Sequence, residues 1–239
     1  MQSYRRILLS GLLRTPTGLM NLLQMTVLSY YFGNNGRTPY VHYMLLLGIP
    51  AFLGQLIAAG AAPKLADKHG AATTFAQANV FAGLALLAAF ALFLCRPQQL
   101  TQALPFTLLI LLLFCNMFCC GLVNTVQSIL IADAADLTEK ESGIRRDGIF
   151  VSGQSLLIKL STGVSALLQG LVFAISGFSG TAVRQINRAL YAGADFATDP
   201  SFATPRFAMF FLFLCLPGIA YLLSALPYRK GRNPHKAPV

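Results

Sequence analysis

Long apolar stretches alternate with short polar breaks along the whole chain. The hydrocarbon core of a bilayer is about 30 Å thick, so a helix that crosses it needs roughly 20 apolar residues. Six stretches reach that length, and they cover residues 7–32, 40–62, 71–95, 104–132, 148–176 and 207–226. The pattern predicts an all-α membrane protein with six transmembrane helices over residues 1–232, followed by a short tail over residues 233–239.

The amino-acid composition agrees with a membrane environment. Of the 239 residues, 55% are apolar and 11% are charged, whereas soluble domains carry roughly 25% charged residues. The alternative, in which some stretches are buried helices of a large soluble protein, is weaker because too few polar residues remain to cover such a core. Soluble enzymes and nucleic-acid-binding proteins are therefore disfavoured, and we expect membrane lipid around the apolar surface.

The Lys and Arg residues are divided unequally between the two sides of the predicted bundle. The chain has 18 Lys and Arg against 8 Asp and Glu, for a net charge of +10. The side that holds both termini carries Arg5, Arg6, Lys64, Lys68, Lys140, Arg145, Arg146, Arg229, Lys230, Arg232 and Lys236. The other side carries Arg37, Arg96, Arg184, Arg188 and Arg206, and two basic residues fall within spans.

Basic residues of short loops accumulate on the cytoplasmic side of a membrane. We therefore expect a multi-pass protein of the bacterial inner membrane with both termini in the cytoplasm. The positive charge would then serve orientation and attraction to anionic lipid, with no role in binding nucleic acid.

Neither the cysteines nor the histidines form a pattern typical of a metal site. Cys115, Cys119 and Cys120 lie on one predicted helix among apolar neighbours, where cysteine acts as a small packing residue. The three histidines lie at a span edge, in a break and in the tail. We expect no metal site, no cofactor and no catalytic residue.

The fifth span contains an ionisable side chain near its middle. Lys159 lies eleven residues after Gly148, which is about 17 Å along a helix. A charged group at that depth is costly and usually faces a cavity or a partner. Ser152 and Ser155 precede it at helical spacing, and with Gln154 they predict a polar stripe that contacts substrate. The alternative is that Lys159 reaches an interface or pairs with a carboxylate to stabilise the bundle.

Two other spans carry polar stripes. In the fourth span, Asn124 and Gln127 are three residues apart and share a helix face. In the first span, Asn21 and Gln24 have the same spacing, and Arg14 lies seven residues before Asn21. These faces are candidate linings of a substrate cavity. Hydrogen bonds that hold the bundle together are the alternative for the fourth span.

The segment DAADLTEKESGIRRDGIFVSGQSLLIK, residues 133–159, contains a further pattern. It resembles the region between the tenth and eleventh helices of the glycoside–pentoside–hexuronide:cation symporters, the melibiose-carrier relatives within the major facilitator superfamily. Those proteins typically show an Asp-x-x-Asp pair, a Glu-x-Lys followed by Gly and Arg, and then a helix with a buried Lys. The matching residues here are Asp133, Asp136, Glu139, Gly143, Arg145 and Lys159.

The resemblance implies the second half of a twelve-helix transporter. Members of that family have two six-helix halves, with the substrate cavity between them near the bilayer midplane. This chain resembles helices seven to twelve, so a matching N-terminal half or a second copy of the chain is the expected partner. The resemblance further implies symport of a sugar-like small molecule with Na⁺ or H⁺, whose carboxylate ligands would lie on the missing half. It also implies that Lys159 lies at the cavity and takes part in substrate and cation handling.

The charged segment after the fourth span is a candidate cytoplasmic gate. Asp133, Asp136 and Glu139 precede Arg145 and Arg146. Carboxylates beside guanidinium groups can form ion pairs that hold one conformation of a rocking bundle. The alternative is a solvated loop, whose ion pairs contribute about 0–1 kcal/mol each.

Two functional hypotheses follow from these patterns. The first is half of a secondary active transporter, and the second is a non-transporting truncated remnant or membrane interaction protein. A membrane-embedded enzyme is disfavoured, because no span carries paired carboxylates or a Ser and His pair. A neighbouring reading frame that encodes six matching helices would favour the split transporter.

Overall fold

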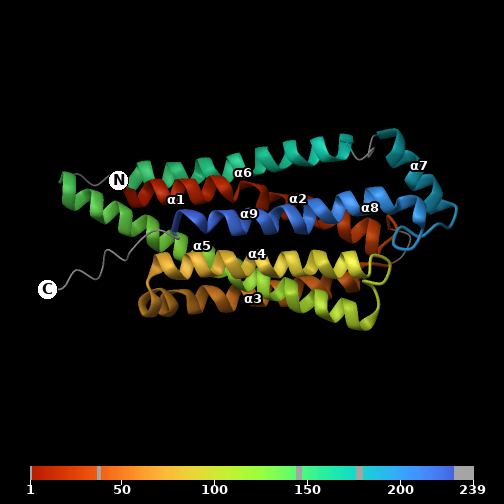
Figure 1. Ribbon diagram of the computed structural model, residues 1–239, viewed down its shortest axis with the longest axis horizontal. Helices are drawn as coiled ribbons and strands as arrows, with labels where there is room; N and C mark the ends of the chain where they lie inside the picture. The colour runs from red at the N-terminus through yellow and green to blue at the C-terminus, as the bar shows by residue number, and fades with distance from the viewer. Residues whose placement is uncertain (1, 37–38, 144–146, 176–179, 229–239) are drawn as a thin grey trace.

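Helices make up the regular structure of the computed structural model, which describes residues 2–36, 39–143, 147–175 and 180–228 (Figure 1). The four longest are α3 (Val41–His69), α4 (Ala71–Cys95), α5 (Ala103–Ser142) and α6 (Asp147–Ile175). No strand occurs within the described ranges, so the all-α prediction is confirmed there. Five segments are long and apolar enough to cross a membrane, namely Val41–His69, Ala71–Cys95, Ala103–Lys140, Gly148–Ile175 and Pro200–Tyr228.

The N-terminal segment, predicted as one span, is helical but broken near its middle. It consists of α1 (Gln2–Leu13), a 3-10 turn (Thr15–Thr17), α2 (Gly18–Val27) and a π-helical turn (Leu28–Phe32). Pro16 causes the break, because proline has no N–H to donate to the carbonyl oxygen of Leu12. The Thr15 Oγ1 donates to that oxygen instead, at 2.8 Å.

The break is fastened to α6 by two serine side chains. The Oγ atoms of Ser161 and Ser165 donate to the carbonyl oxygen of Thr15, at 2.6 and 3.1 Å. Gly18 permits this approach, since a Cβ at that position would lie 2.7 Å from the Ser165 Oγ. The Thr15 oxygen, which also accepts from the Gly18 N–H, therefore links the break to α6.

The acidic residues that the sequence analysis assigned to a break lie on a helix. α5 continues through residue 142 and ends at Gly143, whose φ of 68° terminates it. Ala134 and Ala135 are buried against Ile7 and Phe150, and this packing extends the helix beyond the apolar span. The predicted end of the fourth span at residue 132 marks the end of the apolar run and not the end of the helix.

The predicted break over residues 177–206 contains a short amphipathic helix, α7 (Gly180–Tyr191), at one end of the bundle (Figure 1). Ile186 and Leu190 are buried, whereas Arg184 and Arg188 are exposed. The last span then runs through a 3-10 turn (Pro200–Phe202), α8 (Ala203–Phe210), a π-helical turn (Phe211–Cys215), α9 (Leu216–Ser224) and a 3-10 turn (Leu226–Tyr228).

Small residues let the long helices approach closely. α5 packs along α3 and α4, and α4 packs along α9. At Gly121 of α5 an added Cβ would lie 2.8 Å from the Ala58 Cβ of α3. At Gly83 of α4 it would lie 2.7 Å from the carbonyl oxygen of Gly218 in α9. Close contact through small residues is typical of helix association in membranes.

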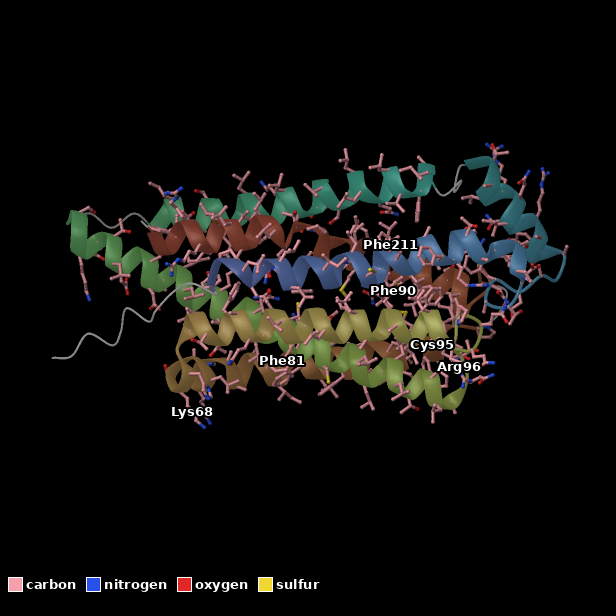
Figure 2. The ribbon with its side chains drawn as sticks, viewed as in Figure 1. Lys68, Phe81, Phe90, Cys95, Arg96 and Phe211 are labelled. Atoms are coloured by element: carbon pink, nitrogen blue, oxygen red, sulfur yellow. The ribbon has the colours of Figure 1, made fainter. Side chains whose placement is uncertain are left out.

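A buried arginine fixes the connection between α7 and α8. Lys68 and Arg96 lie at opposite ends of the bundle, and this connection lies at the end that holds Arg96 (Figures 1 and 2). The Nη1 of Arg206, whose side chain is 4% exposed, donates to the carbonyl oxygens of Phe196 and Ala197, both at 2.8 Å. The Asn34 Oδ1 accepts from the Phe196 N–H at 2.9 Å.

Asp199 caps the 3-10 turn that begins the last span, and this geometry predicts a pH dependence. Its Oδ1 accepts from the Ser201 N–H at 2.8 Å and from the Ser201 Oγ at 2.7 Å, and these hydrogen bonds hold the pKa of Asp199 below its ordinary value. A lowered folded-state pKa means that the stabilisation is present above the unfolded value of about 3.9 and is lost as the pH falls through the folded value.

We therefore expect Ser201→Ala to unfold at a lower temperature than the wild type at pH 6, with the difference shrinking below about pH 3.9. Thermal unfolding of the variant and of the wild type, at pH 6 and at a pH below about 3.9, measures this difference in unfolding temperature. A difference that grows on acidification would contradict the assignment of the cap.

Candidate functional site

A polar cavity of about 550 Å³ lies where the break in the N-terminal segment faces α5 and α6. Its polar lining comes from five parts of the fold, namely the N-terminal segment, α3, α5, α6 and α9. These residues are Arg14, Thr17, Asn21, Gln55, Cys120, Asn124, Gln127, Ser128, Gln154, Ser161, Thr162 and Tyr221. Within the described part of the chain, the lining includes no Asp or Glu.

Arg14 provides the formal charge in the described lining. It directly precedes the 3-10 turn, where its carbonyl oxygen accepts from the Thr17 N–H at 2.9 Å. Its Nη2 donates to the Oε1 of Gln127, a buried side chain of α5, at 2.6 Å. Its Nη1 is buried and has no hydrogen-bond partner among the described residues. The pair joins the N-terminal segment to α5 across the cavity.

Successive turns of α5 continue the polar surface. Cys120, Asn124, Gln127 and Ser128 are spaced so that they share one face of the helix. The Cys120 Sγ lies 3.1 Å from the Oη of Tyr221 on α9, and the Ser128 Oγ donates to the carbonyl oxygen of Asn124 at 3.3 Å. Asn124 and Ser128 are exposed, so the cavity opens at the surface of the bundle.

Four of the predicted cavity residues line this space, and they come from three separate parts of the chain. They are Asn21, Asn124, Gln127 and Gln154. Gln24, predicted on the same stripe as Asn21, lines a smaller cavity of about 80 Å³, which Asn21 also lines beside apolar side chains. Gln127 makes a bundle-stabilising hydrogen bond and also lines the cavity, so the two alternatives for the fourth span coexist at that residue.

The other predicted residues of α6 lie outside the described lining. Ser152, Ser155 and Lys159 are exposed, and the Ser152 Oγ donates to the carbonyl oxygen of Ile149 at 2.9 Å. Lys159 is three residues before Thr162, which lines the cavity, and the two side chains are about 60° apart around the helix axis. The polar stripe of α6 therefore borders the mouth of the cavity.

The predicted gate is only partly within the described residues. Asp133 and Asp136 are exposed and Glu139 is half-buried, all on the last turns of α5. Arg145 and Arg146 lie outside the described residues. The ion-pair network thus stays a prediction.

Arg14, on the predicted polar stripe of the first span, also lines the cavity. Three further lining residues, Cys120, Ser161 and Tyr221, were not predicted from the sequence. They become recognisable only when the helices are packed together.

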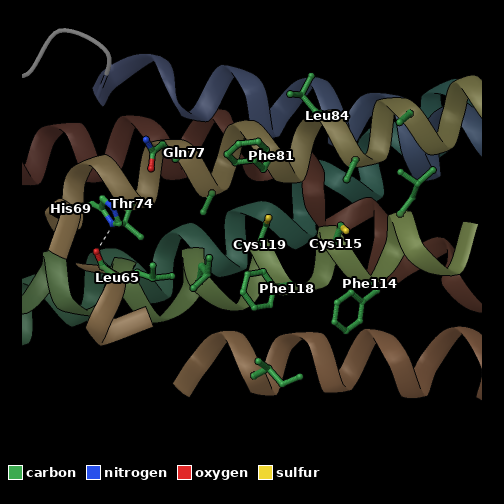
Figure 3. Close-up of a pocket in the computed structure, with 16 residues that line it drawn as sticks. Leu65, His69, Thr74, Gln77, Phe81, Leu84, Phe114, Cys115, Phe118 and Cys119 are labelled. Atoms are coloured by element: carbon green, nitrogen blue, oxygen red, sulfur yellow. Dashed lines mark hydrogen bonds between the residues drawn. The ribbon is translucent and has the colours of Figure 1, made fainter. Parts of the chain in front are cut away.

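A second, larger recess of about 710 Å³ lies along α4 and α5 and has a different chemistry. Figure 3 shows the rings of Phe81, Phe114 and Phe118 along it, with the polar side chains gathered at one end. There, the Thr74 Oγ1 donates to the carbonyl oxygen of Leu65 at 3.1 Å. An apolar lining of this kind suits lipid chains, so we take the polar cavity as the candidate solute site.

Apolar spanning helices around a polar cavity define a multi-pass membrane protein of the transporter type. A family model described as MFS/sugar transport protein matches residues 1–230. The chain belongs to this family, in which MFS denotes the major facilitator superfamily, and it is therefore a membrane transporter-type protein and not an enzyme.

One curated relative is the "Uncharacterized 29.9 kDa protein in crtE 3'region" of Pseudescherichia vulneris. It is 26% identical over 189 residues, which are 79% of this chain and 62% of the relative. The chain thus spans less than two thirds of the length of that relative. No solved structure matches the chain.

Proposed function

We propose that the chain is one six-helix half of a secondary transporter that carries a sugar-like solute together with Na⁺ or H⁺. The polar cavity carries this proposal, because its amide and hydroxyl groups suit a solute rich in hydroxyl groups. The broken segment from Gln2 to Phe32 would be the sixth span. Discontinuous helices beside a midplane cavity are typical of secondary transporters.

The surface around the cavity mouth supports a partner half. Lys159, Ser152 and Ser155 lie exposed on α6, and an ammonium group facing hydrocarbon is costly. A matching N-terminal half, or a second copy of the chain, would cover this face and enclose the cavity. The expected location is the bacterial inner membrane with both termini in the cytoplasm. Asp133, Asp136 and Glu139 with Arg145 and Arg146 would then form the cytoplasmic gate.

Uptake into vesicles tests the proposal. We expect the chain, co-reconstituted with an N-terminal six-helix half from the same family, to accumulate a radiolabelled sugar when a Na⁺ or H⁺ gradient is imposed. Lys159→Ala should lower the initial rate by at least tenfold, because the ammonium at the mouth would no longer meet substrate or the partner half. Lys159→Arg should restore little of the uptake rate, since a planar guanidinium group does not replace a compact ammonium group.

Lys68→Ala is the matched control, because Lys68 is an exposed lysine at the end of α3. It should leave both uptake and the quantified membrane fraction unchanged. Normal uptake by Lys159→Ala would assign the lysine a structural role. Absence of uptake in every combination, with both halves inserted, would favour a non-transporting remnant or interaction protein.

A further inference from the structure

The apolar recess of about 710 Å³ is long enough for a lipid chain and lies open at the surface of the bundle. Its lining comes from α3, α4 and α5, and along α4 it reaches from Thr74 to Ala88. Ala88 lies fourteen residues after Thr74, which is about 21 Å along a helix, whereas one leaflet of the hydrocarbon core is about 15 Å thick. Ile57, Phe81 and Leu84 line the recess and are 56, 63 and 50% exposed. An acyl chain of one leaflet could therefore lie along it.

The apolar recess and the polar cavity lie on opposite faces of α5. Phe118 and Leu122 line the recess, whereas Cys120 and Asn124 line the polar cavity. Residues two positions apart in a helix differ by about 160° around its axis. A partner half that covered the polar cavity would therefore leave the recess facing the lipid.

The end of the recess nearest the connection between α3 and α4 is polar. His69, Thr74 and Gln77 lie there (Figure 3). Gly70 alone connects α3 to α4, and the two helices run antiparallel (Figure 1). Lys64 lies six residues before Gly70 and Gln77 lies seven residues after it. The lysine and the glutamine are therefore at about the same level on the two neighbouring helices.

Lys64 belongs to the face of α3 that lines the recess. It follows the lining residue Ile57 by seven positions, so the two side chains are about 20° apart around the helix axis. Both side chains are exposed. Asp67, the acid of α3, is about 80° from Ile57, and the described lining of the recess includes no Asp or Glu. Lys68 lies one turn beyond this level and outside the proposed site.

The depth of Lys64 matches that of a lipid headgroup. The apolar stretch predicted for α3 ends at residue 62, so Lys64 lies about 3 Å beyond it along the helix. Basic residues at this level, in pockets between membrane helices, attract anionic headgroups. A zwitterionic headgroup carries an ammonium group of its own, which the Lys64 ammonium repels.

We propose that the apolar recess is a binding site for an anionic phospholipid. An acyl chain would lie along Phe81 and Phe118, and the phosphate group would accept hydrogen bonds from the Lys64 ammonium and the Gln77 amide. A lipid with a net negative charge, such as phosphatidylglycerol, would bind in preference to the zwitterionic phosphatidylcholine. This site is independent of the solute that the polar cavity binds.

Fluorescence quenching tests the proposal, because the chain contains no tryptophan. Phe81→Trp places one reporter in the recess of the full chain, which is titrated in mixed micelles with phosphatidylglycerol or phosphatidylcholine brominated on the acyl chains. We expect phosphatidylglycerol to quench at an about fivefold lower mole fraction, the effect of one lysine at the headgroup level. Lys64→Gln in this background should remove the preference. Lys64→Arg should retain it, since the positive charge remains.

Two matched controls separate a defined site from general attraction to a basic surface. Phe52→Trp places the reporter on a part of α3 that does not line the recess, and Phe52 is 66% exposed against 63% for Phe81. Its quenching should not distinguish the two lipids, whose bromine atoms occupy the same carbons. Lys140→Gln removes an exposed lysine from the last turn of α5. It should leave the preference seen with Phe81→Trp unchanged.

Three outcomes would overturn the proposal, and thermal unfolding first verifies that each variant is folded. Equal quenching of Phe81→Trp by the two lipids would show that the recess accepts any acyl chain. An undiminished preference after Lys64→Gln would assign the headgroup contact to another residue. Quenching of Phe52→Trp without quenching of Phe81→Trp would show that protein, such as a second copy of the chain, covers the recess.

Discussion

Replacing Gly121 by Val is expected to lower the unfolding temperature of the purified protein by roughly 6–12 °C. A Cβ at this position would lie 2.6 Å from the backbone carbonyl oxygen of Gln55 and 2.8 Å from the Ala58 Cβ. Neither atom belongs to the far end of a flexible side chain, so α3 and α5 would have to move apart. Overpacking costs up to about 3 kcal/mol, and 1 kcal/mol shifts the midpoint of a domain of this size by about 2–4 °C.

Gly60→Val is the control for this substitution. Gly60 lies on α3, within the same helix pair, and an added Cβ there meets no atom within 4 Å. The same residue change should therefore leave the unfolding temperature nearly unchanged, because an exposed glycine gains helix propensity when it is replaced. Equal effects of the two substitutions would show that the α3–α5 contact is looser than the distances indicate.

Arg206→Met is expected to cost about 3 kcal/mol or more, because a hydrogen bond to a charged group contributes about 1.5–3 kcal/mol. The Arg206 Nη1 donates to the carbonyl oxygens of Phe196, Ala197 and Asp199, at 2.8, 2.8 and 3.4 Å. Methionine keeps much of the side-chain volume and removes every donor. The connection before α8 should then lose its order first, which hydrogen exchange of residues 194–202 would detect.

Arg188→Met provides the comparison for Arg206→Met. Arg188 is exposed on the neighbouring helix α7, and an exposed arginine contributes little to stability. It should shift the unfolding temperature by no more than about 2 °C, the equivalent of about 0.5 kcal/mol. If Arg206→Met were equally mild, water would have replaced the guanidinium at the three carbonyl oxygens.

The sequence predicted the long helices well, because the apolar run of a span is visible in one dimension. Predicted stretches 40–62 and 71–95 coincide with the apolar parts of α3 and α4. The extension of α5 past residue 132 was not visible, since it depends on Ala134 and Ala135 packing against Ile7 and Phe150. α7 was missed because one short amphipathic helix gives no long apolar run.

The candidate site was only partly predictable for a similar reason. Helical spacing correctly grouped Asn124 with Gln127, and both line the cavity. Depth along a helix identified Lys159 as unusual, but depth does not specify which way a side chain points. The structure turns Gln154 and Ser161 of the same helix into the cavity and leaves Lys159 exposed beside its mouth.

The sequence by itself determined that this chain is an all-helical membrane protein, because hydrophobicity and length restrict what a lipid bilayer accepts. It predicted one span over residues 7–32, although Pro16, which cannot donate a backbone hydrogen bond, interrupts that helix in the structure. Only the tertiary structure decided what the interruption does. Ser161 and Ser165 reach the Thr15 oxygen from 146 and 150 residues away, and the Arg14 Nη2 donates to Gln127 of α5. Contacts between such distant segments depend on how the helices rotate and pack against one another. Side-chain shape and hydrogen bonding determine that packing only in three dimensions.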